Sequence, residues 1–475
     1  MSFRHNLSAI LLCTALSFIA SCASSDHPVA TPADSTTGAE PDYGQHGLKI
    51  GREPQIDVLE DLAVTDPELA LNQLDEFLLT NDDPQLDLLF GIASLNLLEQ
   101  RQQQGKLGLA LAADLFADAE YSFTRCVKIP DLSARAQRGL ARIGVRRGDF
   151  TRAWDFALQW HAASSESFSY NDYLLMGELG LRRIIADRQQ AQAENHFDGI
   201  NVPAPHLAVE AFEAALKIQP TYDTFIDLAD LHIWEERYTA AAKVLIEAIK
   251  FAPDAETAYQ RLKLSTVGNR NLHVDSLIQV CSYLSNSATA LWYLGEAYYL
   301  QTQDARAAAD FVKAMESLSK SEQCFEQSAI LNQNFSQSCH DWISLVKTMR
   351  IWLLRDDGRI DDALASLTDI LEYSPEALDY PIQSQSLANA VNYLVSDLYQ
   401  QNEYRKAISL LRQVCAVNDS HALFVNNLGL FTRDLATMLS MDGASPSDEA
   451  QELYAESWDV YSRLVELTPD DPRAI

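Results

Sequence analysis

Signatures of catalysis are absent from this 475-residue chain. It contains no Gly-x-Ser-x-Gly turn for a serine nucleophile, no Gly-x4-Gly-Lys loop for phosphates, and no His-Glu-x2-His pair for zinc. A serine, a histidine and an aspartate occur in any long chain, so their presence without a local motif carries no weight. We therefore expect no catalytic residues, no cofactor and no enzymatic activity.

Positive charge is scarce, with 36 lysine and arginine residues against 67 aspartate and glutamate residues. Loss of residues 1–21, argued below, would remove only Arg4 and leave 35 − 67 = −32. Nucleic-acid binding needs basic stripes that displace counterions from phosphates, so we expect no nucleic-acid partner. The acidic surface either keeps a long helical array soluble and separate or recognises a partner.

The seven cysteines form no Cys-x2-Cys pair. Two of them lie in the N-terminal segment described below, and the remaining thiols are Cys126, Cys281, Cys324, Cys339 and Cys415. An odd number cannot all pair, so either Cys324 and Cys339 bridge adjacent helices or all five stay reduced and buried. Cys339 and His340 alone offer zinc no ligand set, and we expect no metal site.

Small, large and small residues recur in a fixed order, and between residues 208 and 253 the order appears twice. Ala-x3-Phe-x2-Ala-x4-Pro begins at Ala208, and Ala-x3-Leu-x2-Ala-x4-Pro begins 241 − 208 = 33 residues later at Ala241. Residues four and seven places apart share a helix face, and small residues there let another helix approach closely. Strand-like alternation is scarce, so we expect an all-α fold.

This order and a period of about 34 residues resemble the second helix of the tetratricopeptide repeat (TPR) family. Phe225, Leu228 and Ala229 precede Ala241 where the family places its first-helix Trp, Leu and Gly. The resemblance implies a right-handed superhelical solenoid of antiparallel helix pairs. Further matches are Leu291, Leu294, Gly295 and Tyr298 with Ala307, Phe311 and Ala314; Ala363, Leu367, Ile370 and Pro375; Val391, Leu394 and Leu398 with Ala407, Leu411, Val414 and Asp419; and Ser457, Tyr461, Leu464 and Pro469.

Several units depart from the family spacing, which predicts extended helices or insertions. Gly91, Gly177 and Gly429 mark first helices whose second helices come late, ending with the Phe123, Phe212 and Tyr461 matches. Between Leu318 and Trp352 the register is open. There Ser321, Phe325 and Ser328 compete with Ala307, Phe311 and Ala314 as the second helix, and one continuous long helix would account for both sets.

The N-terminus predicts export and lipid attachment. Arg4 and His5 precede an apolar run, Leu7 to Ile19, that is too short to span a bilayer as a mature helix. The sequence Ile19-Ala20-Ser21-Cys22 resembles the bacterial lipobox, which implies cleavage before Cys22 and acylation of that cysteine. The expected domains are a signal peptide over 1–21, a disordered linker over 22–47 and the solenoid over 48–475.

The lipobox resemblance implies the periplasmic side of a bacterial envelope, with several acyl chains giving a durable anchor. Ala23 after the cysteine favours the outer membrane by analogy with well-studied sorting rules. The membrane is then a partner through the anchor alone.

Family first helices line a concave groove, and carrying over their positions residue by residue implies a partner-binding set. That set is Ile226, Asp230, Trp234, Trp292, Glu296, Tyr299, Asn392, Ser396 and Tyr399. Acid beside aromatic rings suits an extended peptide carrying Lys or Arg, through ion pairs and cation–π contacts. In the alternative, Trp234, Trp292 and Tyr299 simply pack between repeats.

These features together predict a lipid-anchored envelope scaffold or adaptor that binds a protein or a basic peptide. Two alternatives stay open, an accessory solute-handling lipoprotein of a transporter and the N-terminal TPR part of a longer enzyme or assembly factor. The second arises because Pro469-Asp-Asp-Pro472 is how a TPR chain enters a further first helix, so we expect a solenoid truncated at its C-terminus.

Overall fold

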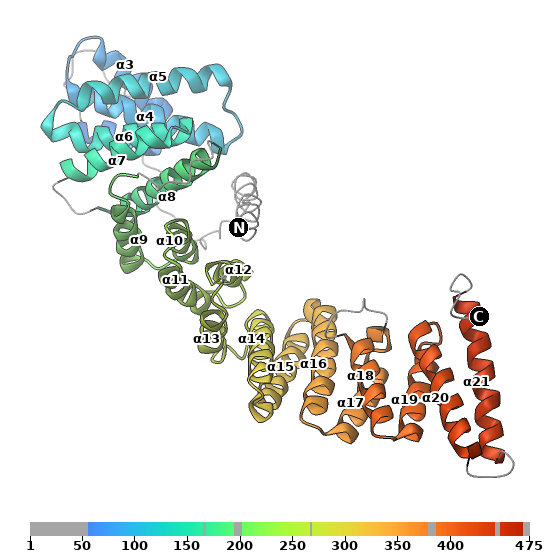
Figure 1. Ribbon diagram of the computed structural model, residues 1–475. Coiled ribbons are helices and arrows are strands. Elements are labelled where there is room, and N and C mark those ends of the chain that lie inside the picture. The colour runs from blue at the N-terminus through green and yellow to red at the C-terminus, as the bar shows by residue number, and fades with distance from the viewer. Residues whose placement is uncertain are drawn as a thin grey trace, which may run out of the picture. The chain divides into compact units, whose positions relative to one another are not determined.

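The structure is a computed structural model that describes residues 56–164, 168–193, 202–266, 268–378, 386–441 and 447–468. Four predicted features lie outside these residues: the signal peptide, the lipid site Cys22, the linker and the stretch from Pro469 to Pro472. The described residues form α-helices and two short 3₁₀ helices with no strand, so the predicted all-α solenoid is confirmed. Consecutive helices pack on one another along the chain (Figure 1).

The helices alternate as first and second members of pairs from α4 onward. Their bounds are α2 (Ile56–Thr65), α3 (Pro67–Leu78), α4 (Pro84–Gln103), α5 (Leu109–Cys126), α6 (Pro130–Arg147), α7 (Phe150–Ala163), α8 (Tyr170–Ala193), α9 (His206–Ile218), α10 (Tyr222–Trp234), α11 (Tyr238–Phe251), α12 (Glu256–Ser265), α13 (Arg270–Cys281), α14 (Ala288–Ala307), α15 (Phe311–Leu331), η1 (Gln333–Phe335), α16 (Ser336–Asp356), α17 (Ile360–Tyr373), η2 (Pro375–Leu378), α18 (Leu387–Gln400), α19 (Tyr404–Val417), α20 (Ala422–Met441) and α21 (Asp448–Leu467).

The turn inside six of the pairs has one repeated geometry. A residue in the left-handed region follows the first helix, and the next N–H bonds to the carbonyl five residues back at 2.8–2.9 Å. This is the Schellman ending of a helix, which satisfies carbonyls that the helix leaves open. The left-handed residues are Gly105 (φ 65°), Gly148 (73°), Glu236 (62°), Ala309 (55°), Gly358 (77°) and Asn402 (62°).

A glycine of the first helix lies beneath an aromatic ring of the second helix in four pairs. A methyl group placed on Gly177 would come within 2.6 Å of the Phe212 ring, and one on Gly295 within 2.8 Å of Phe325. The corresponding distances are 3.0 Å for Gly91 and Phe123 and 3.1 Å for Gly429 and Tyr461. The late second helices predicted for Gly91, Gly177 and Gly429 are therefore confirmed.

The open register around α15 is resolved by the same contact. Phe325 covers Gly295, and the Ser321 hydroxyl donates to the Gly295 carbonyl at 2.8 Å. Ala307 ends α14, so its assignment to the second helix is wrong. Phe311 and Ala314 do lie in α15, as the prediction of one long helix required. The helices α14 and α15 are long, with 20 and 21 residues. As a result, the ring that covers Gly295 comes about four helical turns later in the sequence than the family spacing would place it.

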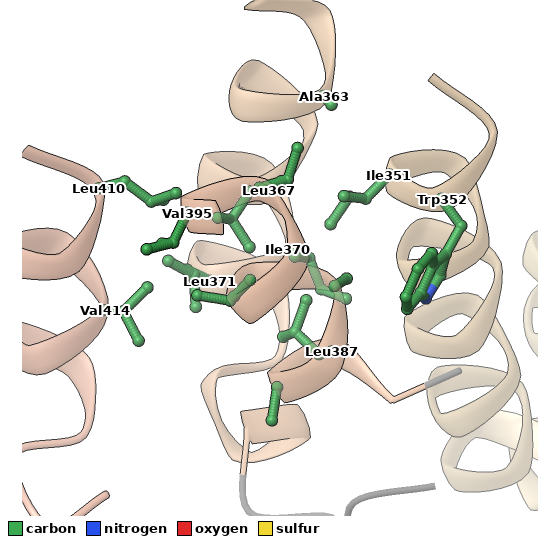
Figure 2. Packing of buried hydrophobic residues seen from close by; sticks show 14 of the residues in the cluster. Ile351, Trp352, Ala363, Leu367, Ile370, Leu371, Leu387, Val395, Leu410 and Val414 are labelled. Carbon is green, nitrogen blue, oxygen red and sulfur yellow. The ribbon is translucent and has the colours of Figure 1, made fainter. Parts of the chain in front are cut away.

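Apolar side chains of successive helices form continuous cores. Figure 2 shows one of them, in which Trp352 of α16, Leu367 of α17, Val395 of α18 and Leu410 of α19 lie in the same cluster. Each fully buried side chain of this kind contributes about 1.5–3 kcal/mol relative to an exposed one. The cores, not local helix propensity, supply most of the stability of the array.

Polar and thiol side chains also have defined places in these helices. The Asp83 carboxylate accepts from the N–H of Gln85 at 2.9 Å, so it caps α4 as a helix start. All five cysteines of the described chain are unpaired, and Cys324 and Cys339 are buried separately. Cys324 and Cys339 are therefore unpaired and buried, as the second alternative stated, whereas Cys415 is only half-buried. No helix within the described ranges is both long and apolar enough to cross a membrane.

We predict that alanine at the glycines will destabilise the protein in proportion to the closeness of the ring. Gly177→Ala and Gly295→Ala meet rings that are fully buried, and overpacking of this kind costs about 1–3 kcal/mol. Alanine also favours the helix by about 1 kcal/mol, which offsets the milder contacts. In urea unfolding, the midpoints of Gly177→Ala and Gly295→Ala should fall clearly below those of Gly91→Ala and Gly429→Ala. Equal midpoints across the series would contradict the ring contact as the constraint.

Candidate partner-binding site

The nine predicted groove residues lie on α10, α14 and α18, but four of them are not accessible. Ile226, Asp230, Glu296 and Tyr299 are each less than 10 % exposed. An open groove at these four positions is therefore a wrong expectation. The reason is the close approach of neighbouring first helices, which cover positions that the family uses for ligands.

Both predicted carboxylates already hold cations from within the chain. The Arg261 Nε atom lies 2.7 Å from Oδ1 of Asp230, and the Lys263 ammonium lies 2.8 Å from Oε1 of Glu296. Arg261 and Lys263 both belong to α12, so one short helix neutralises its neighbours on either side. A buried charge left without its partner is costly, so removing Arg261 or Lys263 would destabilise the array.

Trp292 and Tyr299 pack between repeats, as expected if these rings do not line a groove. The Trp292 Nε1–H donates to the Ser338 hydroxyl at 3.0 Å, and Trp342 stands edge-on to Trp292 and Tyr299 with ring centroids 5.9 and 5.5 Å away. Trp234 is half-buried, and its carbonyl accepts from Arg188 at 2.7 Å. These rings fix the spacing of helices and leave little face for a ligand.

The α18 residues contact α20 in the same way. Asn427 donates to the Asn392 side-chain oxygen at 3.3 Å, and the Tyr399 hydroxyl donates to Asp434 at 3.1 Å. The Tyr399 ring also stacks on Phe431 with centroids 4.5 Å apart. Ser396 is half-buried and accepts a long hydrogen bond from Gln400 within its own helix. All three side chains keep some exposure.

Arg261 and Lys263 were missed because α12 lacks the family's Leu-Gly pair, which was the signal used to find first helices. A different signal is present. Asp230, Lys263 and Glu296 are spaced by 33 residues and alternate in charge. Equivalent positions of adjacent repeats are neighbours in a stacked array, so alternating charge at the repeat period predicts ion pairs between repeats.

An accessible group of acidic side chains lies one turn earlier on α10. Asp223 and Asp227 precede Asp230 on one face of that helix, and Glu178 of α8 lies close enough to act electrostatically on Asp227. Burial first, and then the three other carboxylates, raise the pKa of Asp227 to about 7. Burial likewise raises the pKa of Asp230 to about 6, although Arg261 opposes the shift.

Cations only partly balance this group, which we call the α8–α10 acidic site. Arg182 pairs with Glu178 at 2.6 Å and Arg261 with Asp230, so the four carboxylates face two arginines and carry −4 + 2 = −2 when all are ionised. Within the described part of the chain, no cation lies within ion-pair distance of Asp227. Asp223 is exposed and Asp227 half-buried, so solvent reaches the site.

Comparisons with known proteins return similarity to solved structures only. No family model matches the sequence, and no curated relative matches it. Among solved structures it is similar to a human IFIT1 dimer with m7Gppp-AAAA, at 13 % identity over 89 % of this chain and 92 % of that one, TM-score 0.23. It is also similar to Cut9 in the APC/C Cut9–Hcn1 hetero-tetramer, at 10 % identity over 88 % and 95 %, TM-score 0.23.

A third similar structure is the apo form of RapI, at 11 % identity over 86 % of this chain and 97 % of that chain, with a TM-score of 0.30. All three are TPR-like helical-repeat proteins. At such TM-scores the chains do not superpose as whole molecules, so the functions of these proteins carry no argument about this one. The fold described above is TPR-like.

We predict that Asp227→Asn will stabilise the protein at pH 8 and leave its stability nearly unchanged at pH 4.5. An aspartate whose folded-state pKa is raised to about 7 must ionise against its surroundings as the pH rises, so its contribution to stability falls between about pH 4 and pH 7. The uncharged amide removes that cost. Urea midpoints at the two pH values test this, with Asp223→Asn as the exposed control. A stabilisation that is equal at both pH values would refute the assigned cause.

Proposed function

We propose that this protein is a non-enzymatic scaffold of the bacterial envelope that binds a protein segment bearing Lys or Arg at the α8–α10 acidic site. The observation that carries the proposal is the unbalanced charge around Asp227. Burial and neighbouring carboxylates already disfavour its ionisation. A cationic side chain from a partner would relieve that repulsion. We therefore expect the site to bind lysine or arginine side chains of a partner.

The spacing of the acids suits a guanidinium or ammonium group. Asp223 and Asp227 are four residues apart on α10, so their side chains lie one turn apart on one face. A planar guanidinium bonds two carboxylate oxygens at once, which gives a partner's arginine both affinity and orientation. The partner class expected from the sequence is thereby kept, while the residues that would contact it shift from Asp230 and Glu296 to Asp223 and Asp227.

Attachment to the membrane is the second part of the proposal, and it rests on the sequence around Cys22. A lipid on that cysteine and a linker of about 25 residues would hold the N-terminal helix of the array roughly 25–30 Å from the anchor. The proposed location is the periplasmic side of the envelope, at the outer membrane. A tether of this length lets the array reach partners that are embedded in or bound to the same membrane.

Replacing Cys22 by Ser tests the anchor. The variant should lose the mass of the acyl chains and move from the membrane fraction to the soluble periplasmic fraction, with an unchanged helical circular dichroism spectrum. Cys415→Ser, at a half-buried thiol in α19, serves as the control and should stay with the membrane. Membrane association that survives Cys22→Ser would overturn the anchor without affecting the acidic site.

The acidic site is tested by titrating a lysine- and arginine-rich decapeptide into the protein by calorimetry at low ionic strength. Binding should tighten from pH 6 to pH 8 as Asp227 ionises, and Asp223→Asn with Asp227→Asn should weaken it about tenfold at pH 8. The matched control is Glu210→Gln with Glu213→Gln, two exposed acids on α9 that remove the same formal charge. An equal loss in the control pair would mean that only net charge acts.

A further inference from the structure

Positive charge is concentrated in one part of this acidic chain. Residues 125–152 contain eight lysine or arginine residues and two aspartates, so this stretch carries 8 − 2 = +6 where the whole chain carries −31. Four of its arginines recur every three or four residues along α6 and therefore share one face of that helix. We call these four residues the α6 arginine row: Arg135, Arg138, Arg142 and Arg146.

The α6 arginine row has more cations than carboxylates around it. Its ion pairs are Arg135 with Glu60 of α2, Arg138 with Asp172 of α8 at 2.7 Å, and Arg142 and Arg146 with the single Glu99 of α4 at 2.8 and 3.3 Å. The four arginines and these three carboxylates together carry 4 − 3 = +1. The carboxylates belong to helices on both sides of α6, so the row lies within the array and not at an end of it.

Arg138 is charged in surroundings that disfavour a cation. Its Nε atom is buried and has no hydrogen-bond acceptor in the described part of the chain. Burial lowers the pKa of Arg138; Asp172 opposes this shift, whereas Arg142 and Arg135 add to it. A guanidinium has five N–H donors and this side chain is 40 % exposed, so Arg138 can bind a second carboxylate while it keeps Asp172.

The row lies next to the α8–α10 acidic site, with α8 between the two. Asp172 of α8 pairs with Arg138 on one side, and Glu178 of the same helix acts on Asp227 of α10 on the other. Axes of packed helices are about 8–10 Å apart, so the two charged surfaces are roughly 16–20 Å apart across α8. About five or six residues of extended chain span that distance. One partner segment can therefore reach both surfaces.

We propose that the partner segment has its charges separated along the chain, with Lys or Arg at the α8–α10 acidic site and Asp or Glu at the α6 arginine row. This inference rests on the proposed function and adds a second contact for the same partner. Carboxylates fit because the row already pairs with three of them and keeps one charge in excess. A phosphate would bring a charge of about −1.5 to −2 beside Glu99 and Asp172. Because the two surfaces have opposite charge, the bound segment has one direction.

Two fluorescently labelled peptides of identical composition test the proposal with the full chain. The segregated peptide carries lysines in one half and glutamates in the other, and the alternating peptide carries the same residues in alternation. Neither has a net charge, so the acidic chain as a whole attracts or repels both equally. Fluorescence anisotropy at low ionic strength should show that the segregated peptide binds about tenfold more tightly, the gain expected from one charge-assisted contact.

Substitutions in the row locate the effect. Arg138→Gln with Arg142→Gln should abolish the preference for the segregated peptide without weakening the binding of the lysine- and arginine-rich decapeptide. Arg146→Gln leaves every carboxylate of the row paired and should reduce the preference in part. The matched control is Arg147→Gln with Arg152→Gln, which removes the same formal charge from two arginines that likewise share one carboxylate. That control should keep the full preference, and circular dichroism should show the same helix content in all variants.

The outcomes separate this inference from the proposed function. Equal affinity for the segregated and alternating peptides, or a preference that survives Arg138→Gln with Arg142→Gln, would overturn the inference while the decapeptide still binds. Failure of the decapeptide to bind would contradict the α8–α10 acidic site and, with it, a segment that spans both surfaces. An RNA oligonucleotide that displaces the segregated peptide at lower concentration than the unlabelled peptide does would assign the row to phosphates and refute the proposal.

Discussion

Contact between a glycine and an aromatic ring sets the geometry of the helix pairs on which the rest of the array depends. The ring can lie against the backbone of the first helix only because glycine has no side chain there, as at Gly177 and Gly295. In two pairs a serine one turn before the ring donates to the carbonyl of that same glycine, at 2.8 Å in both Ser321–Gly295 and Ser457–Gly429. Shape and a satisfied carbonyl thus specify one register for these two pairs.

Polar contacts then join one pair to the next. Asp230 with Arg261, Lys263 with Glu296, and Arg355 with Asp397 at 2.6 Å each bridge successive first helices. The desolvation of buried charges offsets much of their attraction, so the apolar cores dominate the stability while the ion pairs favour one order of neighbours. Using these positions for cohesion removes them from ligand binding, which is why the family's groove positions are covered here.

The fold was largely predictable from the sequence, because the glycine–ring pairs leave a local pattern of small and large residues. Gly91, Gly177 and Gly429 were matched to their second helices despite irregular spacing, whereas Ala307 was misassigned because α14 runs longer than a family helix. The site was less predictable. Whether Asp230 faces solvent or Arg261 depends on α12, whose sequence lacks the repeat pattern. Burial of a residue by a neighbouring repeat cannot be predicted from the sequence of its own repeat alone.

Composition alone would assign significance to all 67 acidic residues, yet pairing decides which of them can act on a partner. Asp230, Glu296 and Asp397 already have cations and serve the array. Asp227 is different, since its neighbours are acids and its pKa is raised to about 7. A charge that the fold holds at a cost gains more from an external cation than a charge that the fold has already neutralised. The basic partner proposed above would therefore bind this chain where its own ion-pair pattern is interrupted.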